Sequence, residues 1–246
     1  MTFRRIIFIV FALFCGACNK ESAPDCFRKA GDEATEERTL EAFERIELRD
    51  YIHYELTESD NYKAEITGPK NLLHKIECTV SDGRLLVRNG NTCNFMRSFR
   101  NPITVRIYAP SFPDIQNYAT GNVRTTGTIY TSPFKIENRN AAGEVRLRVN
   151  NATLSVLTHT GVCDVRIEGE CNTLNLFSQG VGVIDGSALQ ASYAYVNNSS
   201  INDVSVRASD YLFALIRLDG DIYVHGNPGF VDQQDEGPGQ LIYAEE

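Results

Sequence analysis

The chain has 246 residues, a length that fits one large domain or two small ones. Hydrophobic residues make up 42% of the chain and charged residues 23%, which excludes a wholly disordered protein. The formal net charge of −8 argues against a nucleic-acid partner, because a protein that binds nucleic acid needs a basic face.

The first 17 residues are typical of an export signal. Two arginines precede an apolar run over residues 6–14, which is shorter than the about 20 residues that a membrane-spanning helix needs. Small residues then precede Cys18, as they do at the lipidation site of bacterial lipoproteins. We therefore expect a signal peptide over residues 1–17, acylation of Cys18, and an exported outer-membrane lipoprotein that faces the periplasm or the surface. An ordinary signal peptide cleaved near Ala17 is the alternative.

Acidic segments flank the body of the chain. Residues 18–37 are polar and lack hydrophobic periodicity, which predicts a flexible acidic tether between the membrane anchor and the folded domain. Residues 231–246 hold 5 acids and no base and are interpreted as an acidic tail. The body between them, residues 38–230, holds 21 acids and 19 bases. Its net charge therefore does not exclude an anionic ligand.

The sequence pattern of the body predicts short strands. Apolar and polar residues alternate with a period of two between Gly, Asn and Asp, which is typical of strands joined by turns. Residues 38–112 show no repeat and predict a less regular N-terminal β region that caps the rest of the body. One short helix is expected near residues 71–76, and a hairpin turn at residues 81–83. The expected strands of this region are residues 43–48, 52–56, 62–66, 76–80, 85–88 and 103–108.

Residues 113–230 contain an internal repeat of about 20 residues. Small or turn-forming residues precede a β-branched residue at Val123, Val145, Val165, Val183, Val204 and Ile222. These six positions form a first apolar column of the repeat. A second apolar column stands seven to nine residues earlier in each repeat: Ile115, Ile136, Val156, Leu176, Val196 and Leu215. A unit this short buries a core only by stacking on its neighbours. We therefore predict an all-β fold with a right-handed parallel β-solenoid, in preference to a β-sandwich.

Several motifs resemble a known family. Phe43-Glu-Arg-Ile46, Ile107-Tyr-Ala-Pro110, the glycine-punctuated repeats and the closing segment over residues 220–228 resemble the head-GIN-domain family of auto-transporter adhesins. These proteins are secreted or lipid-anchored and are most common in Bacteroidota. The resemblance implies an all-β, repetitive fold and supplies no catalytic site.

The repeats also align charged residues. In four repeats the residue before the β-branched position is acidic: Glu144, Asp164, Asp203 and Asp221. Such a column could bind Ca²⁺ or a sugar polymer, although Asn122 and Gly182 interrupt it. Arg146 and Arg166 follow two residues after an acid and would neutralise it on the same strand face. We take Glu144, Asp164, Arg146 and Arg166 as binding candidates, with ordinary turn residues as the structural alternative.

No catalytic motif accompanies these columns. The sequence lacks nucleotide-binding loops, nucleophile elbows and metal-ligand spacings, so we assign no catalytic residue, cofactor or metal. We expect a non-enzymatic envelope protein for binding, adhesion or scaffolding, with a glycan or an envelope protein as its partner. The alternative is a polysaccharide lyase or glycoside hydrolase built on a β-helix, which would need paired carboxylates across a cleft.

The cysteines offer one candidate disulfide. An exported protein meets an oxidising compartment, and Cys78 and Cys93 bracket a hairpin, which makes them the best candidate pair. Cys163 with Cys171 is a weaker alternative.

Overall fold

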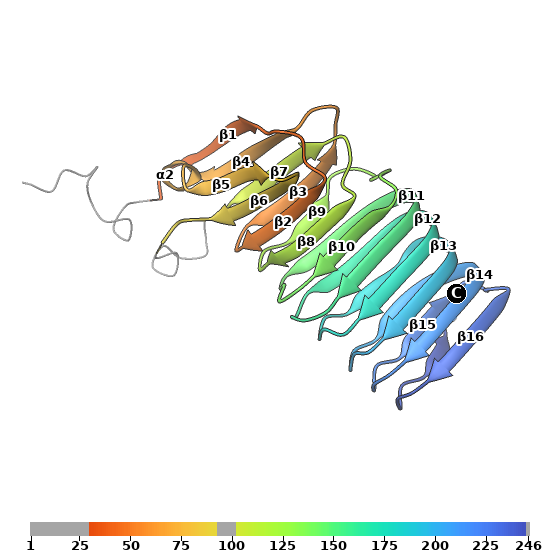
Figure 1. Cartoon of the computed structure of the whole chain (residues 1–246). Coiled ribbons are helices and arrows are strands. Elements are labelled where there is room, and N and C mark those ends of the chain that lie inside the picture. The colour runs from red at the N-terminus through yellow and green to blue at the C-terminus, as the bar shows by residue number, and fades with distance from the viewer. Residues whose placement is uncertain (1–29, 93–101, 245–246) are drawn as a thin grey trace, which may run out of the picture.

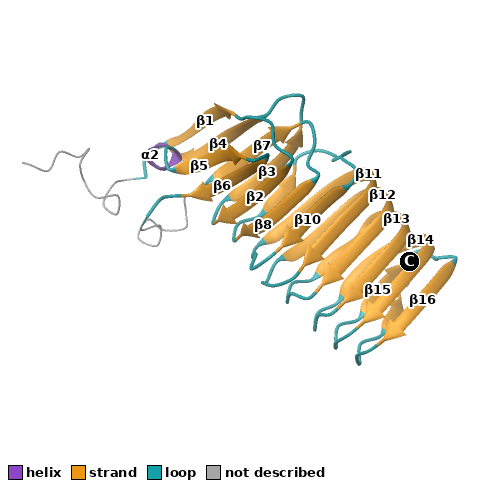
Figure 2. Cartoon of the chain, in the orientation of Figure 1, coloured by secondary structure: helices purple, strands orange, loops and turns teal. Residues whose placement is uncertain are grey.

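A computed structural model describes residues 30–92 and 102–244 and shows a nearly all-β solenoid of about 6 turns (Figures 1 and 2). The helix within this part of the chain is α2 (Lys70–Leu73). The strands in chain order are β1 (Glu33–Thr39), β2 (Arg45–Asp50), β3 (His53–Glu58), β4 (Lys63–Pro69), β5 (Ile76–Ser81), β6 (Arg84–Asn89), β7 (Thr104–Ala109), β8 (Asp114–Ala119), β9 (Val123–Thr125), β10 (Phe134–Asn138), β11 (Glu144–Thr158), β12 (Asp164–Ser178), β13 (Ile184–Asn198), β14 (Val204–Ile216), β15 (Ile222–His225), β16 (Phe230–Asp235) and β17 (Leu241–Tyr243).

Each long strand contributes to two walls of the solenoid. The first half of β11 pairs with β9 and its second half pairs with β10, so the chain turns a corner within this strand. Val149 and Leu154 both point into the core although they are five positions apart, which would place them on opposite faces of one straight strand; the corner lies between them. In the first wall the paired strands follow the order β1, β4, β7, β3 and β9, then the first halves of β11 to β14, and finally β15 and β17. In the second wall the order is β5, β6, β2, β8 and β10, then the second halves of β11 to β14, and finally β16.

Parallel stacking confirms the predicted solenoid and the predicted core columns, with two exceptions. The first column runs in register through Val145 and Val165, but its next member is the buried Ile184 rather than Val183. Val183 is 49% exposed, because its backbone N–H is held in the turn by the side chain of Asp164. In the second column Ala214, not Leu215, takes the rung beside Val196. Where two apolar residues are adjacent, the alternating pattern alone does not show which of them faces the core.

The N-terminal β region closes one end of the stack. β1 pairs antiparallel with β4, β4 pairs antiparallel with β7, and β5 forms an antiparallel hairpin with β6. The turn of that hairpin has positive φ at both Asp82 (51°) and Gly83 (70°), which matches the twist of paired strands. The buried Leu72 and Leu73 of α2 complete this cap. All six expected strands of the region are present.

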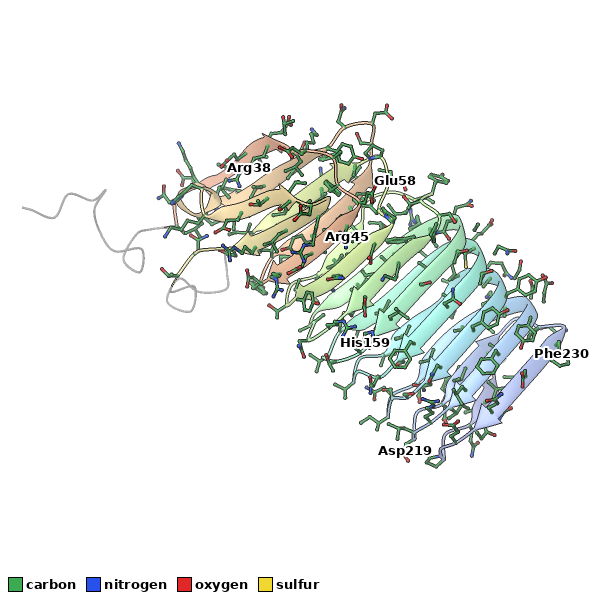
Figure 3. The ribbon with its side chains drawn as sticks, in the orientation of Figure 1. Arg38, Arg45, Glu58, His159, Asp219 and Phe230 are labelled. Atoms are coloured by element: carbon green, nitrogen blue, oxygen red, sulfur yellow. The ribbon has the colours of Figure 1, made fainter. Side chains whose placement is uncertain are left out.

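Two expected boundaries are wrong. β1 begins at Glu33, inside the expected tether of residues 18–37, and pairs with β4 along its whole length. β16 and β17 occupy much of the expected tail of residues 231–246 and add a final coil to both walls. Both segments are polar because they form outer strands, where charged side chains stay in water while the backbone pairs. Figure 3 labels Arg38 and Phe230 at these opposite ends of the stack.

Several expectations concern residues outside the described ranges. The signal peptide, Cys18 and Cys93 all lie there, so the pairing of Cys78 with Cys93 and the acylation of Cys18 stay predictions. Cys163 and Cys171 are buried free thiols, so the weaker alternative pair is wrong. The extended first half of β12 separates them, whereas a disulfide needs Cα atoms within about 7 Å. No helix within residues 30–92 and 102–244 is long and apolar enough to cross a membrane.

Candidate functional site

A groove of about 630 Å³ lies on the outer face of the first wall. Its charged lining is mainly basic and consists of Arg106, Arg124, Arg146, Arg148, Arg166, Glu168 and Asp185. We call this feature the arginine groove. Arg124, Arg146 and Arg166 are direct register partners on β9, β11 and β12, so they form a ladder with a rise of about 4.8 Å per coil.

Strand alternation places the arginines on this face. In the segment Val145-Arg-Leu-Arg-Val149 the three apolar side chains are buried, and the two arginines point outward. The parallel register then repeats the outward position in each coil, which is how residues about 20 apart in sequence become neighbours. The side chains of Arg146 and Arg166 remain 59% and 62% exposed.

A buried carboxylate lies at the N-terminal end of the ladder. Glu55 on β3 is a register partner of Arg106 on one side and of Arg124 on the other. Arg106 Nε donates to Glu55 Oε2 at 2.6 Å, and Arg124 Nε donates to Glu55 Oε1 at 3.0 Å. Burial raises the pKa of Glu55, but the hydrogen bonds from Arg124 and Arg106 outweigh it and hold the pKa below its ordinary value. Glu55 is therefore a fixed anion.

Sequence reasoning did not identify Glu55, Arg106 or Arg124 as site residues. Glu55 occupies an outward position of a short strand in the non-repeating region, where an acid is ordinary. Its burial comes from two arginines that are 51 and 69 residues away in sequence and fold over it. The outward position of Arg124, two residues after Asn122 in the first repeat, was the available signal.

Three of the four predicted binding residues come together in the groove region. Arg146 Nε donates to Glu144 Oε2 at 2.6 Å, and Arg166 Nε lies 3.3 Å from Glu144 Oε1. The hydrogen bond to Glu144 raises the pKa of Arg146. The two-residue spacing therefore places acid and base on one face, as expected.

Asp164 takes a different role. Its Oδ1 accepts the backbone N–H of Val183 in the next coil at 2.9 Å. The same contact recurs along the acidic column: Asp203 Oδ1 accepts from Asp221 N at 2.9 Å, and Asp221 Oδ1 accepts from Gln240 N at 2.7 Å. These side chains tie successive coils together, which is the structural alternative, and Asp164 does not line the arginine groove.

A second polar ladder lies inside the solenoid. Its buried members follow the second apolar column by two residues: Asn117, Asn138, Thr158, Ser178 and Asn198. Asn117 Nδ2 donates to Asn138 Oδ1 at 2.9 Å, and Asn138 Nδ2 donates to Thr158 Oγ1 at 3.2 Å. Sequence reasoning missed this ladder, although its regular spacing after the second column was a readable signal. Its buried hydrogen bonds join successive coils from within.

The remaining acids of the groove also have partners. Glu168 accepts from Arg148 Nε at 2.7 Å, and Asp185 Oδ1 accepts from the hydroxyl of Ser187 at 2.6 Å. Among the described residues, no group of three or more His, Cys, Asp or Glu side chains could hold a metal ion. The groove therefore offers outward guanidinium donors above carboxylates that are already engaged.

The fold and the groove define a β-solenoid that presents a charged strand wall. The chain matches the family described as "Putative auto-transporter adhesin, head GIN domain" over residues 42–228, and it belongs to that family. This confirms the predicted resemblance and indicates a secreted or surface protein. No curated protein matches the chain.

Solved structures share the fold. A putative adhesin from Bacteroides fragilis NCTC 9343 has a TM-score of 0.78 at 23% identity, with coverage of 87% of this chain and 97% of that one. A putative lipid binding protein from Parabacteroides distasonis ATCC 8503 has a TM-score of 0.67 at 16% identity, covering 87% and 98%. A putative adhesin from Parabacteroides merdae ATCC 43184 reaches 0.58 at 16%, covering 88% and 98%. At these identities the likeness shows the fold alone.

Proposed function

We propose that this protein is a non-enzymatic binding or adhesion module of the cell envelope and that the arginine groove is its binding surface. The observation that carries the proposal is the in-register ladder of Arg124, Arg146 and Arg166 on three successive coils. A solenoid wall repeats the same donor at a fixed interval, which suits a ligand that is extended and repetitive. A glycan or an extended segment of an envelope protein has this form.

The state of the carboxylates that pair with the groove arginines supports binding over catalysis. A lyase or glycosidase needs a carboxyl group whose pKa is raised so that it can donate a proton, or a free carboxylate that can attack. Here the pKa of Glu55 is lowered by two arginines, and Glu144 is held by Arg146 and Arg166. The basic lining also disfavours an acyl chain, so the lipid-binding name of the Parabacteroides distasonis neighbour is no argument for a lipid tail in this groove.

The proposal includes anchoring at the outer membrane. Acylation of Cys18 by two or more chains would hold the protein stably, since each buried methylene contributes about 0.8 kcal/mol. The tether then comprises residues 18–32, because β1 begins at Glu33. Membrane fractionation of the wild type and C18A tests this part. Retention of C18A in the membrane fraction would show that Cys18 is not the anchor.

The binding surface is tested with the purified C18A chain as bait on a glycan array and in pull-downs from cell envelopes. We expect the triple variant R124Q/R146Q/R166Q to lose the partner that the parent chain captures. R217Q is the matched control, because Arg217 is also exposed and also pairs with an acid, Glu236, at 3.0 Å. Capture of the same partner by the triple variant would refute the groove as the binding surface.

A further inference from the structure

We propose that the arginine groove binds an acidic polysaccharide whose chain runs along the solenoid axis, with one anionic group at each of the three coils that carry Arg124, Arg146 and Arg166. This inference rests on the proposed binding function of the groove and adds the chemical class of its ligand. The geometry that points to it is the combination of outward guanidinium edges, sunken carboxylates and a coil spacing that matches a sugar repeat.

Arg146 and Arg148 keep their terminal donors available, whereas Arg124 also donates to Glu55 through one terminal nitrogen, Nη2. Arg146 and Arg148 make their hydrogen bonds to Glu144 and Glu168 through Nε. A guanidinium carries five N–H donors, and both of these side chains are 59% exposed, so their terminal Nη donors remain accessible to a ligand. These donors have the spacing for bidentate recognition of a carboxylate or a sulfate group.

The two carboxylates that pair with the ladder, those of Glu55 and Glu144, lie below the guanidiniums, whereas Glu168 of the groove lining is 52% exposed. The side chain of Glu55 is 6% exposed and that of Glu144 is 24% exposed, whereas those of Arg124 and Arg166 are 61% and 62% exposed. Beside Arg124, Arg146 and Arg166 the charge nearest the solvent is therefore positive. A groove concentrates this local field, which favours an anion at its mouth.

The register sets the repeat of the ligand. Arg124, Arg146 and Arg166 stand on neighbouring strands about 4.8 Å apart. A pyranose ring spans a similar length, so a polymer with an acid on every sugar can place one anion beside each arginine. Thr125 and Thr126 also line the groove, with their hydroxyl groups hydrogen-bonded to Arg148 N and to Thr57 Oγ1.

An acidic peptide fits this groove less well. Peptides commonly bind solenoids and sheets by adding a strand to an open edge. β9, β11 and β12 each have a paired neighbour on both sides in the first wall, so they leave no backbone edge beside the groove. A ligand read by side chains alone, with anions at regular intervals, is therefore the better match.

The test measures binding of the full C18A chain to polygalacturonate, with neutral dextran, polyglutamate and phosphatidylglycerol vesicles as comparison probes. We expect polygalacturonate to bind and dextran not to bind. The double variant R146Q/R166Q should weaken binding at least about tenfold, and the affinity should fall with added salt. R217Q should bind as the parent chain does. Circular dichroism and thermal unfolding establish that each variant is folded.

Four outcomes would overturn the inference. They are absence of polygalacturonate binding by the folded parent chain, equal affinity of R146Q/R166Q, binding of polyglutamate as tight as that of polygalacturonate, or preferential binding of the vesicles. The proposed function, that the groove is a binding surface, is judged by the array and pull-down experiments instead. If an array or pull-down partner requires the arginines but is neutral or a protein, the groove remains the binding surface and only its ligand class is wrong.

Discussion

The Glu55 site permits a sharp test of the groove electrostatics. In E55Q the side chain keeps its size and one acceptor oxygen but loses the charge that Arg106 and Arg124 face. Removing one partner of a buried ion pair costs about 3–5 kcal/mol, and an exposed pair contributes under about 1 kcal/mol. Glu55 is buried, but the side chains of Arg106 and Arg124 are 41% and 61% exposed and can turn to water. We therefore expect a loss of about 2 kcal/mol in the free energy of unfolding at pH 7.

The pH dependence of this loss has a definite sign. The pKa of Glu55 is lower in the folded chain than in the unfolded chain, where it is about 4.3. Its stabilising contribution is therefore fully present above about pH 5 and is lost as the pH falls through the folded-state value. The difference between wild type and E55Q should stay constant from about pH 7 to about pH 5 and shrink below about pH 4.

Urea unfolding followed by far-ultraviolet circular dichroism measures both quantities, since the chain has no Trp for fluorescence. E168Q is the matched control, because Glu168 also pairs with an arginine but its side chain is 52% exposed. We expect E168Q to cost under about 0.5 kcal/mol. If E55Q proves as stable as E168Q at pH 7, or if its deficit persists unchanged to pH 3, the account of Glu55 as a buried structural anion is wrong.

Other positions test the stacking itself. G182A should destabilise the chain by more than about 2 kcal/mol in urea unfolding, because an added Cβ would lie 1.9 Å from the carbonyl oxygen of Cys163; G127A, with open space at that position, should change little. N138A should cost about 1–3 kcal/mol, because it removes the acceptor of Asn117 Nδ2 and the donor to Thr158 Oγ1 inside the core; a change under about 0.5 kcal/mol would contradict the ladder. Burial raises the pKa of the Cys163 and Cys171 thiols to about 12, so at pH 8 both should resist maleimide until urea is added, as mass spectrometry of the labelled peptides would show.

The fold was largely predictable because residues that stack in register on successive coils are one coil length apart in the sequence, which therefore shows a period. Val145 and Val165 share a core column, and the residues between them repeat in type, so the coil length is readable. The wrong assignment of Val183 and Leu215 to the two core columns shows the limit of this prediction. Each stands next to another apolar residue, and the pairing register of the strands decides which of the two takes the position in the column.

The site was less predictable than the fold. The pairing of Glu144 with Arg146 follows from a spacing of two residues on one strand, which any alternating segment reveals. The role of Glu55 depends on strands that meet only after the non-repeating region has folded onto the first repeat. Local alternation cannot show which distant side chains will cover an acid.

The last coil leaves open strand edges at the C-terminal end of the solenoid. β16 and β17 each pair with one preceding strand within the described part of the chain, so their outer edges expose the hydrogen-bonding groups that built every earlier coil. The same edge of a second molecule could pair with them and join two stacks end to end. β16 carries Asp232 and Asp235, and Glu236 follows it directly, so two such edges would repel each other. The acidity of this end therefore opposes the end-to-end joining of two stacks through their last coils.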